Sequence, residues 1–190
     1  MNKKNILVTG ALGHIGSELI REYAKREDIG KIRILDNFLT QRYYSLFNLP
    51  NNINYEFIEG DIRDKISAEK AVKDIDVVLH LAAITDAPAT IAKKEETMSV
   101  NLNGTECILE SSIKYGVKRF IFPSSTSVYG EAEGIVDENT PIDRLRLSSP
   151  YAESKLDAEK IVMEANGKSG IETIVLRNGT IFGTSVGMRF

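Results

Sequence analysis

The chain has 190 residues, 42% of them hydrophobic and 27% charged, which fits a soluble protein with one full hydrophobic core. A net charge of -3 gives no general case for a nucleic-acid or anionic-membrane partner, and no segment has the length of a membrane span. The single cysteine, Cys107, excludes an intrachain disulfide, and the two histidines lie in separate segments without metal-ligand spacing. We therefore expect a cytoplasmic protein without a metal site.

Six short apolar runs, rich in Ile, Val and Phe, predict strands that are buried on both faces. In chain order they cover residues 5–10, 31–36, 53–61, 76–83, 119–125 and 172–178. Helices are predicted between them, from Gly13 through Tyr23, at 67–75, at 94–115 and from Pro150 to about Asn166. Ser149 and Pro150 mark the start of the last helix, because the N–H that proline lacks is not needed at the first helical position.

Strand and helix alternate along the whole chain. This order predicts an α/β fold of the Rossmann type, which is a doubly wound parallel sheet with helices on both faces. Ligands of such sheets bind at the carboxyl ends of the strands, and the polar motifs of this sequence fall at those ends. We expect residues 1–190 to form one domain with its ligand site at this edge of the sheet.

The sequence TGALGHIGSEL joins the first predicted strand to the first predicted helix and contains Gly10, Gly13 and Gly16. Glycines let the backbone turn tightly and approach a pyrophosphate, and a helix N-terminus offers free N–H groups to the anion. The alternative is a tight turn that binds nothing. The preceding strand, the following helix and an acidic residue further on favour dinucleotide binding.

The acidic residue is Asp36, which ends the second predicted strand about 20 positions after Gly16. A carboxylate there accepts hydrogen bonds from ribose hydroxyls and repels a 2′-phosphate, so the sequence predicts NAD rather than NADP. The alternative is a solvated aspartate that starts a turn. Arg33 and Arg42 lie nearby in the sequence and would blunt the repulsion.

The stretch SSPYAESKLDAE places Tyr151 and Lys155 on one face of the last predicted helix, one turn apart. The spacing alone fits either an acid/base pair or a packing tyrosine beside a solvated lysine. A free tyrosine has a pKa of about 10 and is a poor base at neutral pH. We expect Lys155 and the positive ring of oxidised NAD to favour the phenolate and so to lower the pKa of Tyr151.

Together these motifs resemble the extended branch of the short-chain dehydrogenase/reductase superfamily, and within it the nucleotide-sugar epimerase/dehydratase family that includes UDP-glucose 4-epimerase. The similar segments are TGALGHIG (9–16), DN (36–37), GDIRD (60–64), HLAA (80–83), NLNGT (101–105), SSTSVYG (124–130) and YAESK (151–155). The resemblance implies NAD contacts from Gly10, Gly13, His14, Ile15, Gly16, Asp36, Asn37, Asp61, Ile62, Leu81, Ala82, Ala83, Tyr151 and Lys155.

The resemblance also implies four catalytic positions. Tyr151 is expected to take the proton of the sugar hydroxyl, while Lys155 tunes Tyr151 and holds the nicotinamide ribose. Ser125 is expected to hydrogen-bond the reacting sugar oxygen, and Asn101 to support the site. The implied reaction is 4-epimerisation of a UDP-hexose through a transient 4-keto sugar, with NAD bound and not consumed.

The sequence departs from the family pattern in two places. Dehydratases of this branch carry acids just after the catalytic hydroxyl, whereas this chain has Thr126 and Ser127, which argues against a 4,6-dehydratase. After the sixth predicted strand, many epimerases have an aromatic-rich stretch, whereas this chain reads LRNGTIFG, with Asn178, Gly179 and Thr180. Another reaction on a nucleotide sugar (decarboxylation, dehydration or reduction) and a non-catalytic NAD-sensing module therefore stay as alternatives.

The resemblance implies that residues 1–190 form one NAD(P)-binding Rossmann domain that also carries the catalytic residues. Family members continue past the sixth strand into a small domain that holds the sugar nucleotide, so we expect that domain to be truncated after residue 190. The family also builds homodimers through a bundle of two long helices, which correspond to residues near 94–115 and 151–166. Apolar residues that favour such a dimer, by exceeding what one sheet face covers, are Leu102, Ile108, Leu109, Leu156 and Ile161.

Overall fold

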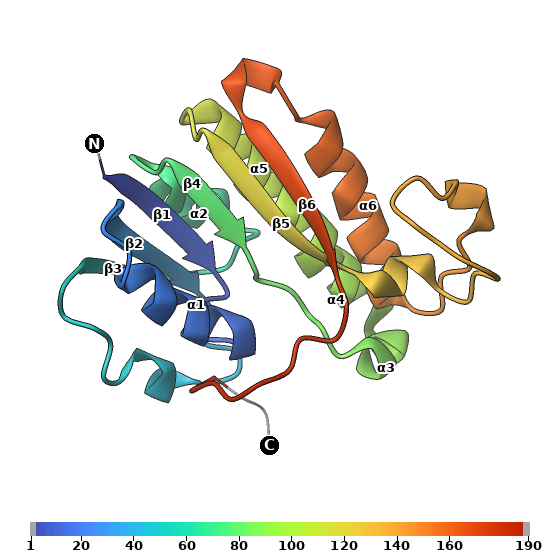
Figure 1. The fold of residues 1–190 in the computed structure, drawn as a ribbon, viewed down its shortest axis with the longest axis horizontal. Coiled ribbons are helices and arrows are strands. Elements are labelled where there is room, and N and C mark those ends of the chain that lie inside the picture. Colours follow the sequence, from blue (N-terminus) through green and yellow to red (C-terminus); the bar gives the residue numbers. More distant parts are fainter. Residues whose placement is uncertain (1–2, 188–190) are drawn as a thin grey trace.

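The computed structural model describes residues 3–187, whose six strands form one parallel sheet in the order β3-β2-β1-β4-β5-β6 (Figure 1). The strands are β1 (Lys4–Thr9), β2 (Ile29–Asp36), β3 (Asn54–Glu59), β4 (Val77–His80), β5 (Arg119–Ser125) and β6 (Glu172–Asn178). The strand order reverses between β1 and β4, and the connections there leave in opposite directions and open a crevice. The predicted Rossmann-type sheet is confirmed.

Helices cover both faces of the sheet (Figure 1). Helix α1 (His14–Ala24) lies on one face, and α2 (Lys65–Val72), α5 (Gly104–Lys114) and α6 (Pro150–Glu164) lie on the other. Shorter elements are α3 (Ala87–Thr90), α4 (Lys94–Met98), a π-helical turn (Ser99–Asn103) and the 3-10 turns Tyr43–Leu46, Ile91–Lys93, Thr126–Tyr129, Ile142–Arg144 and Lys168–Gly170. Among residues 3–187, no helix combines the length and the apolar character needed to cross a bilayer.

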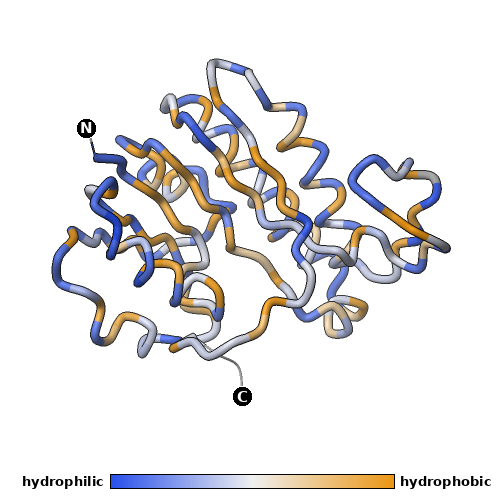
Figure 2. Tube along the Cα trace, viewed as in Figure 1, coloured by the Kyte–Doolittle hydropathy of each residue, from blue (hydrophilic) through white to orange (hydrophobic). Residues whose placement is uncertain are grey.

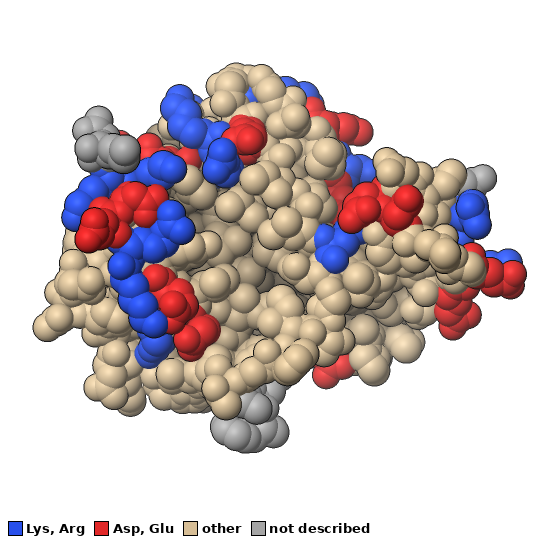
Figure 3. Space-filling view, viewed as in Figure 1, with Lys and Arg blue, Asp and Glu red and all other residues tan. Residues whose placement is uncertain are grey.

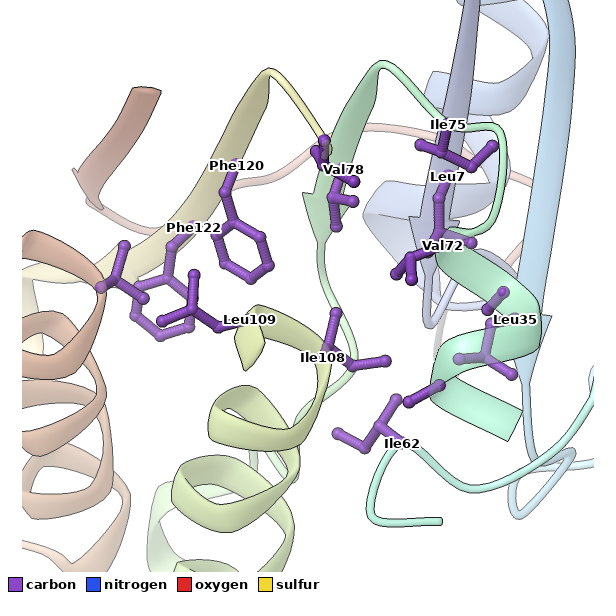
Figure 4. Packing of buried hydrophobic residues seen from close by; sticks show 14 of the residues in the cluster. Leu7, Leu35, Ile62, Val72, Ile75, Val78, Ile108, Leu109, Phe120 and Phe122 are labelled. Atoms are coloured by element: carbon purple, nitrogen blue, oxygen red, sulfur yellow. The ribbon is translucent and has the colours of Figure 1, made fainter. Parts of the chain in front are cut away.

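The alternation of side chains along each strand divides the core into two clusters. Leu7, Phe120 and Phe122 point to the side of α2, α5 and α6, where they pack with Ile108 and Val162 (Figure 4). The neighbouring residues of β1 and β2 point to the other side and pack against α1. Figure 2 shows apolar stretches along the strands, and further apolar residues alternate with polar ones along the helices. Burying both faces explains why the strands are nearly continuous apolar runs.

The face that carries α1 is only partly covered. In Figure 1 no described helix lies over β5 and β6 on this side, and Leu176 of β6 is 44% exposed. Figure 3 shows charged side chains gathered on the side of α1 and the first strands, and few over β5 and β6. This half of the sheet therefore presents a weakly charged, partly apolar surface.

Several element boundaries differ from the prediction, and the differences at α2, β4 and the helix predicted at 94–115 affect the surroundings of the cleft. Helix α2 begins at Lys65 rather than 67, because the Asp64 side chain caps it by accepting from the N–H groups of Ile66 and Ser67. Strand β4 ends at His80, and residues 81–83 continue as a loop. The helix predicted at 94–115 is present, but the π-helical turn interrupts it and divides α4 from α5.

The structure does not support the apolar surplus that favoured a dimer. Ile108, Leu109 and Leu156 are buried in the core of this chain, and Leu102 and Ile161 are half-buried against the same core. The predicted surplus is wrong for the three buried residues, because the sheet face and its helices cover them, whereas Leu102 and Ile161 stay partly exposed beside the core. Dimerisation itself stays a prediction.

Leu7→Ala is expected to lower the free energy of unfolding by about 2–5 kcal/mol, because a fully buried side chain would leave a cavity. Leu176→Ala is the matched control, since it makes the same change at an exposed strand position and should cost less than about 1 kcal/mol. Urea unfolding followed by circular dichroism measures both. Equal losses would contradict the place of Leu7 in the core.

Candidate active site

A cleft of about 820 Å³ lies at the carboxyl ends of the strands, where the sequence placed the site. Its walls contain every predicted site residue except Asn101: Gly10, Gly13, His14, Ile15, Gly16, Asp36, Asn37, Asp61, Ile62, Leu81, Ala82, Ala83, Ser125, Tyr151 and Lys155. Residues from the end of the described chain also line it, among them Asn178, Gly179 and Phe182. The fold therefore brings together motifs that are far apart in the sequence.

The glycine loop is shaped by contacts that exclude side chains. Gly10 has φ +64°, and a Cβ there would lie 2.7 Å from Cα of Ala82. A Cβ on Gly16 would lie 2.6 Å from Cα of Ala11, where α1 packs against the loop. Gly13 caps α1 without a side chain, so the first N–H groups of the helix have no partner among the described residues. These groups and the helix dipole fit a pyrophosphate.

Asp36 is held in place by the loop that it faces. Its Oδ2 accepts a hydrogen bond from Leu12 N–H at 3.1 Å, and its Oδ1 accepts from Phe38 N–H at 3.0 Å. The Ser45 hydroxyl donates to the carbonyl of Leu12 at 2.9 Å, which ties the following loop to the same residue. Asp36 and Asn37 line the cleft, where the carboxylate is fixed to accept from ribose hydroxyls.

The two arginines near Asp36 in the sequence lie in different places, and only one of them lines the cleft. Arg33 was expected to blunt the repulsion of a 2′-phosphate, but it points away and donates to Glu56 at 2.7 Å and to the carbonyl of Ala71 at 2.8 Å. It therefore closes the C-terminal end of α2. Arg42 lines the cleft, is 9% exposed and has no carboxylate partner among the side chains that the structure describes. Its Nη1 lies 3.7 Å from the position of a Cβ on Gly13.

Asp61 and Ile62 form the next part of the rim. The Arg63 guanidinium donates to Asp61 Oδ2 at 2.5 Å and holds the pKa of that carboxyl below its usual range. Ile62 is buried against the start of α5, where a Cβ on Gly104 would lie 2.5 Å from Cδ1 of Ile62. The absence of a side chain at Gly104 thus lets Ile62 approach the helix and complete the wall.

Helix α6 presents Tyr151 and Lys155 to the cleft. Ser149 caps the helix by accepting from Ala152 N–H at 3.2 Å. Lys155 is 4% exposed, donates from Nζ to the carbonyl of Pro123 at 2.9 Å and lies 4.5 Å from the centre of the Phe122 ring. Burial lowers the pKa of Lys155 to about 8, although the charge of Glu159 raises it. Two of its three N–H donors remain for a ligand.

The residues of this chain alone raise the pKa of Tyr151, whereas the prediction relied on Lys155 and on the charge of bound NAD to lower it. Burial raises the pKa of this phenol, and a hydrogen bond with the Ser125 hydroxyl lowers it by less. Lys155 does not perform the expected tuning in this structure, because its ammonium group is directed at the carbonyl of Pro123. A phenolate at Tyr151 therefore requires further positive charge in the cleft.

Ser125 ends β5 beside Tyr151. Its Oγ accepts from Ser127 N–H at 3.1 Å and lies 2.5 Å from Ser127 Oγ, in the 3-10 turn Thr126–Tyr129. Gly130 then turns the chain with φ +59°. The positions where dehydratases carry acids thus hold Thr126 and Ser127, of which the second orients the Ser125 hydroxyl.

Asn101 lies behind the cleft, in the π-helical turn. Its Oδ1 accepts from Ile84 N–H at 2.8 Å, and its Nδ2 donates to the carbonyl of Ile84 and to Ser154 Oγ, both at 3.0 Å. Ser154 in turn donates to the carbonyl of Tyr151 at 2.8 Å. Asn101 therefore joins the loop after β4 to the first turn of α6, and its supporting role in a reaction stays a prediction.

A partly buried ion pair next to the cleft was missed from the sequence. Arg177 of β6 donates from Nη2 to Glu159 Oε2 at 2.8 Å, and its guanidinium lies 5.0 Å from the centre of the Tyr129 ring. Glu159 stands one turn beyond Lys155 on the same helix. No local pattern announces the pair, because its partners are joined only when β6 and α6 pack together.

The geometry agrees with the comparisons with known proteins. A model of the 3-beta hydroxysteroid dehydrogenase/isomerase family matches residues 7–188. The chain belongs to this family, and with it to the extended short-chain dehydrogenase/reductases. A putative UDP-glucose 4-epimerase of Methanocaldococcus jannaschii is 38% identical over 183 residues, which are 94% of this chain and 56% of that protein. The chain spans about half the length of the curated relatives it matches.

Solved structures of this superfamily have the same fold. A UDP-N-acetylglucosamine 4-epimerase from Methanobrevibacter ruminantium, in complex with UDP-N-acetylmuramic acid, has a TM-score of 0.81 and 31% identity over 93% of this chain and 55% of its own. A short-chain dehydrogenase/reductase superfamily protein from Agrobacterium tumefaciens with bound NAD has a TM-score of 0.72 and 29% identity. The match covers 91% of this chain and 48% of that protein's chain. The glycine loop and Asp36 of this chain suit the same cofactor.

Asp36→Ala is expected to lower the affinity for NAD and to narrow the difference in affinity between NAD and NADP. The reason is that the acceptor for the ribose hydroxyls and its negative charge are both lost. Calorimetry with the two cofactors measures the affinities of wild type and variant. Equal affinity of the wild-type protein for NAD and NADP would contradict the role of Asp36.

Arg42→Gln is expected to lower the affinity for NAD about tenfold, because a buried guanidinium beside the glycine loop is placed to pair with phosphate. Arg26→Gln is the matched control, since Arg26 is exposed and pairs with Asp28 outside the cleft. Calorimetry with NAD and with adenosine, which has no phosphate, separates the two contributions. Equal weakening of both ligands would show that Arg42 only packs the loop.

Proposed function

We propose that the chain is the cofactor-binding and catalytic part of an NAD-dependent enzyme that epimerises a nucleotide sugar, acting at C4 of a UDP-hexose. The observation that carries the proposal is the cleft in which Ser125, Tyr151 and Lys155 meet the glycine loop and Asp36. NAD, held by the glycine loop and Asp36, would supply reversible hydride transfer to such a reaction. The nucleotide-sugar class is supported by relatives that are named as UDP-sugar 4-epimerases.

The chain's own residues would manage the proton. Tyr151 Oη takes the proton of the sugar hydroxyl and later returns it, and Ser125 steadies the developing charge by its hydrogen bond to the phenol. Lys155, which has a pKa of about 8, is mostly protonated at neutral pH and offers two free N–H groups from a dry position. Its ammonium charge does not lower the pKa of Tyr151 in this structure. With NAD bound, it would act together with the positive nicotinamide ring to favour the phenolate.

A second candidate function acts on a steroid-like hydroxyl, because the matching family is described as 3-beta hydroxysteroid dehydrogenase/isomerase. The same tyrosine and lysine would serve oxidation of that alcohol. Another nucleotide-sugar reaction would also start in the same way, although Thr126 and Ser127 leave a dehydratase without its usual acids. A non-catalytic NAD sensor is less well supported, since it has no need for Tyr151 and Lys155 together.

The proposal also covers where the cofactor and the sugar nucleotide would bind. We place the dinucleotide and the catalytic residues on residues 1–190, and the sugar nucleotide against chain that this sequence does not contain. Cytoplasmic location and homodimerisation through α5 and α6 complete the proposal.

Tyr151→Phe in the full-length protein is expected to lower turnover by about a hundredfold or more and to leave NAD affinity nearly unchanged, because only the titrating oxygen is lost. Tyr115→Phe is the matched control, since its hydroxyl bonds Glu69 on the surface, away from the cleft. The assay offers UDP-glucose, UDP-N-acetylglucosamine and a 3β-hydroxysteroid, with products identified by NMR. Turnover of the steroid alone would favour the second candidate, and normal turnover in Tyr151→Phe would overturn the role of the tyrosine.

A further inference from the structure

His80 is a buried titratable residue that the proposed reaction does not use. It ends β4, is 1% exposed and does not line the cleft. Its ring lies 5.7 Å from the ring of Phe120 and 6.2 Å from that of Phe122, measured between centres. Both ring nitrogens nevertheless have polar partners, Thr9 Oγ1 at 2.9 Å from Nδ1 and Thr105 Oγ1 at 3.0 Å from Nε2.

These partners determine where the imidazole proton lies. The Thr105 hydroxyl donates to the carbonyl of Asn101 at 2.6 Å, and a carbonyl only accepts, so Thr105 must accept from Nε2–H of His80. At the other nitrogen, Thr9 Oγ1 accepts from Ala82 N–H at 3.1 Å and has its own proton left for Nδ1. The chain of donors is consistent in only this sense, which fixes the neutral tautomer with its proton on Nε2.

The two ends of this series of hydrogen bonds reach opposite sides of the cleft. At one end, Ala82 packs against the backbone of Gly10 so closely that a Cβ would not fit. At the other end, Asn101 holds Ile84 and, through Ser154, the first turn of the helix that carries Tyr151. The series Ala82–Thr9–His80–Thr105–Asn101 therefore connects the floor of the cofactor cleft to the tyrosine helix.

A charged imidazole would reverse one bond of this series, because Nδ1–H would make Thr9 Oγ1 the acceptor and leave the Thr9 proton without its present partner. Burial lowers the pKa of His80 to about 3, and the charge of Lys155 acts in the same direction. The ring therefore stays neutral across the physiological pH range.

We propose that His80 is a positioning residue that transmits the placement of the cofactor floor to Asn101 and the tyrosine helix through one fixed imidazole tautomer. The link to catalysis rests on the proposed function, whereas the tautomer and its hydrogen bonds do not. The role differs from that of a packed core histidine, because core packing alone does not require one particular tautomer.

The first experiment observes the tautomer in the wild-type chain by long-range ¹H–¹⁵N NMR at neutral pH. The sequence has two histidines, so His14→Gln assigns the spectrum. The expected result is a neutral His80 ring with a slowly exchanging proton on Nε2. A proton on Nδ1, or a charged ring, would overturn the proposal without any variant having to fold.

The second experiment removes one link. Thr105→Val keeps the size of the side chain and deletes the hydroxyl, while Thr105→Ser restores it. Thr105→Val is expected to shift the backbone amide signals of Ala82 and Ile84 and to lower the affinity for NAD about fivefold. Thr105→Ser is expected to restore most of the wild-type signal positions and of the NAD affinity. Ser112→Ala is the matched control, since Ser112 Oγ makes the same buried bond to a carbonyl one turn back, 2.7 Å from Ile108 O, outside the series.

The outcomes separate this inference from the proposed function. If Thr105→Val loses stability as Ser112→Ala does but leaves the Ala82 and Ile84 signals and NAD affinity unchanged, His80 is only packed and the proposal is wrong. If the wild-type chain binds no NAD, the cofactor assignment fails, and the tautomer and the amide signals still decide whether the series exists.

Discussion

The contact between the backbones of Gly10 and Ala82 is the constraint on which the rest of the site depends. It lies where the strand order reverses, so that β1 and β4 end side by side and their connections diverge. A positive φ at Gly10 and the missing Cβ let the glycine loop turn directly over the loop that follows β4. Any larger residue would separate the two strand ends, and the N-terminus of α1 would no longer face the crevice.

Desolvated charge is the second theme of the site. Lys155 is almost fully buried with a single carbonyl as its partner, and Glu159 stands one turn away with Arg177. Burying these groups costs free energy that ion pairing only partly offsets. In return, the helix places a lysine with a lowered pKa beside Tyr151, in a position where its charge is poorly screened by water. The same burial raises the pKa of Tyr151, so that the phenol is a weak base until more positive charge enters the cleft.

The sequence was most informative where a motif and its context coincide. The order of elements predicted the sheet, and the glycine loop, Asp36 and the Tyr151–Lys155 pair all reached the same cleft. The errors arose where short local features decide an outcome. Asp64 starts α2 earlier than the hydrophobic pattern indicated, and the π-helical turn around Asn101 leaves no recognisable mark in the sequence. Arg33 and Arg42 both lie near Asp36 in the sequence, yet only Arg42 lines the cleft.

The sequence by itself determined the fold class and the identity of most residues in the cleft, because strand alternation, glycine spacing and helix periodicity are local properties of the chain. The tertiary structure alone decided the direction of the pKa shift at Tyr151, the partner of Arg33 and the tautomer of His80. Each of these depends on burial and on neighbours far apart along the chain: Thr9 with His80, His80 with Thr105, and Lys155 with Pro123. Such electrostatic and hydrogen-bond relations exist only after the chain has packed, since the medium and the distances that set them are produced by folding.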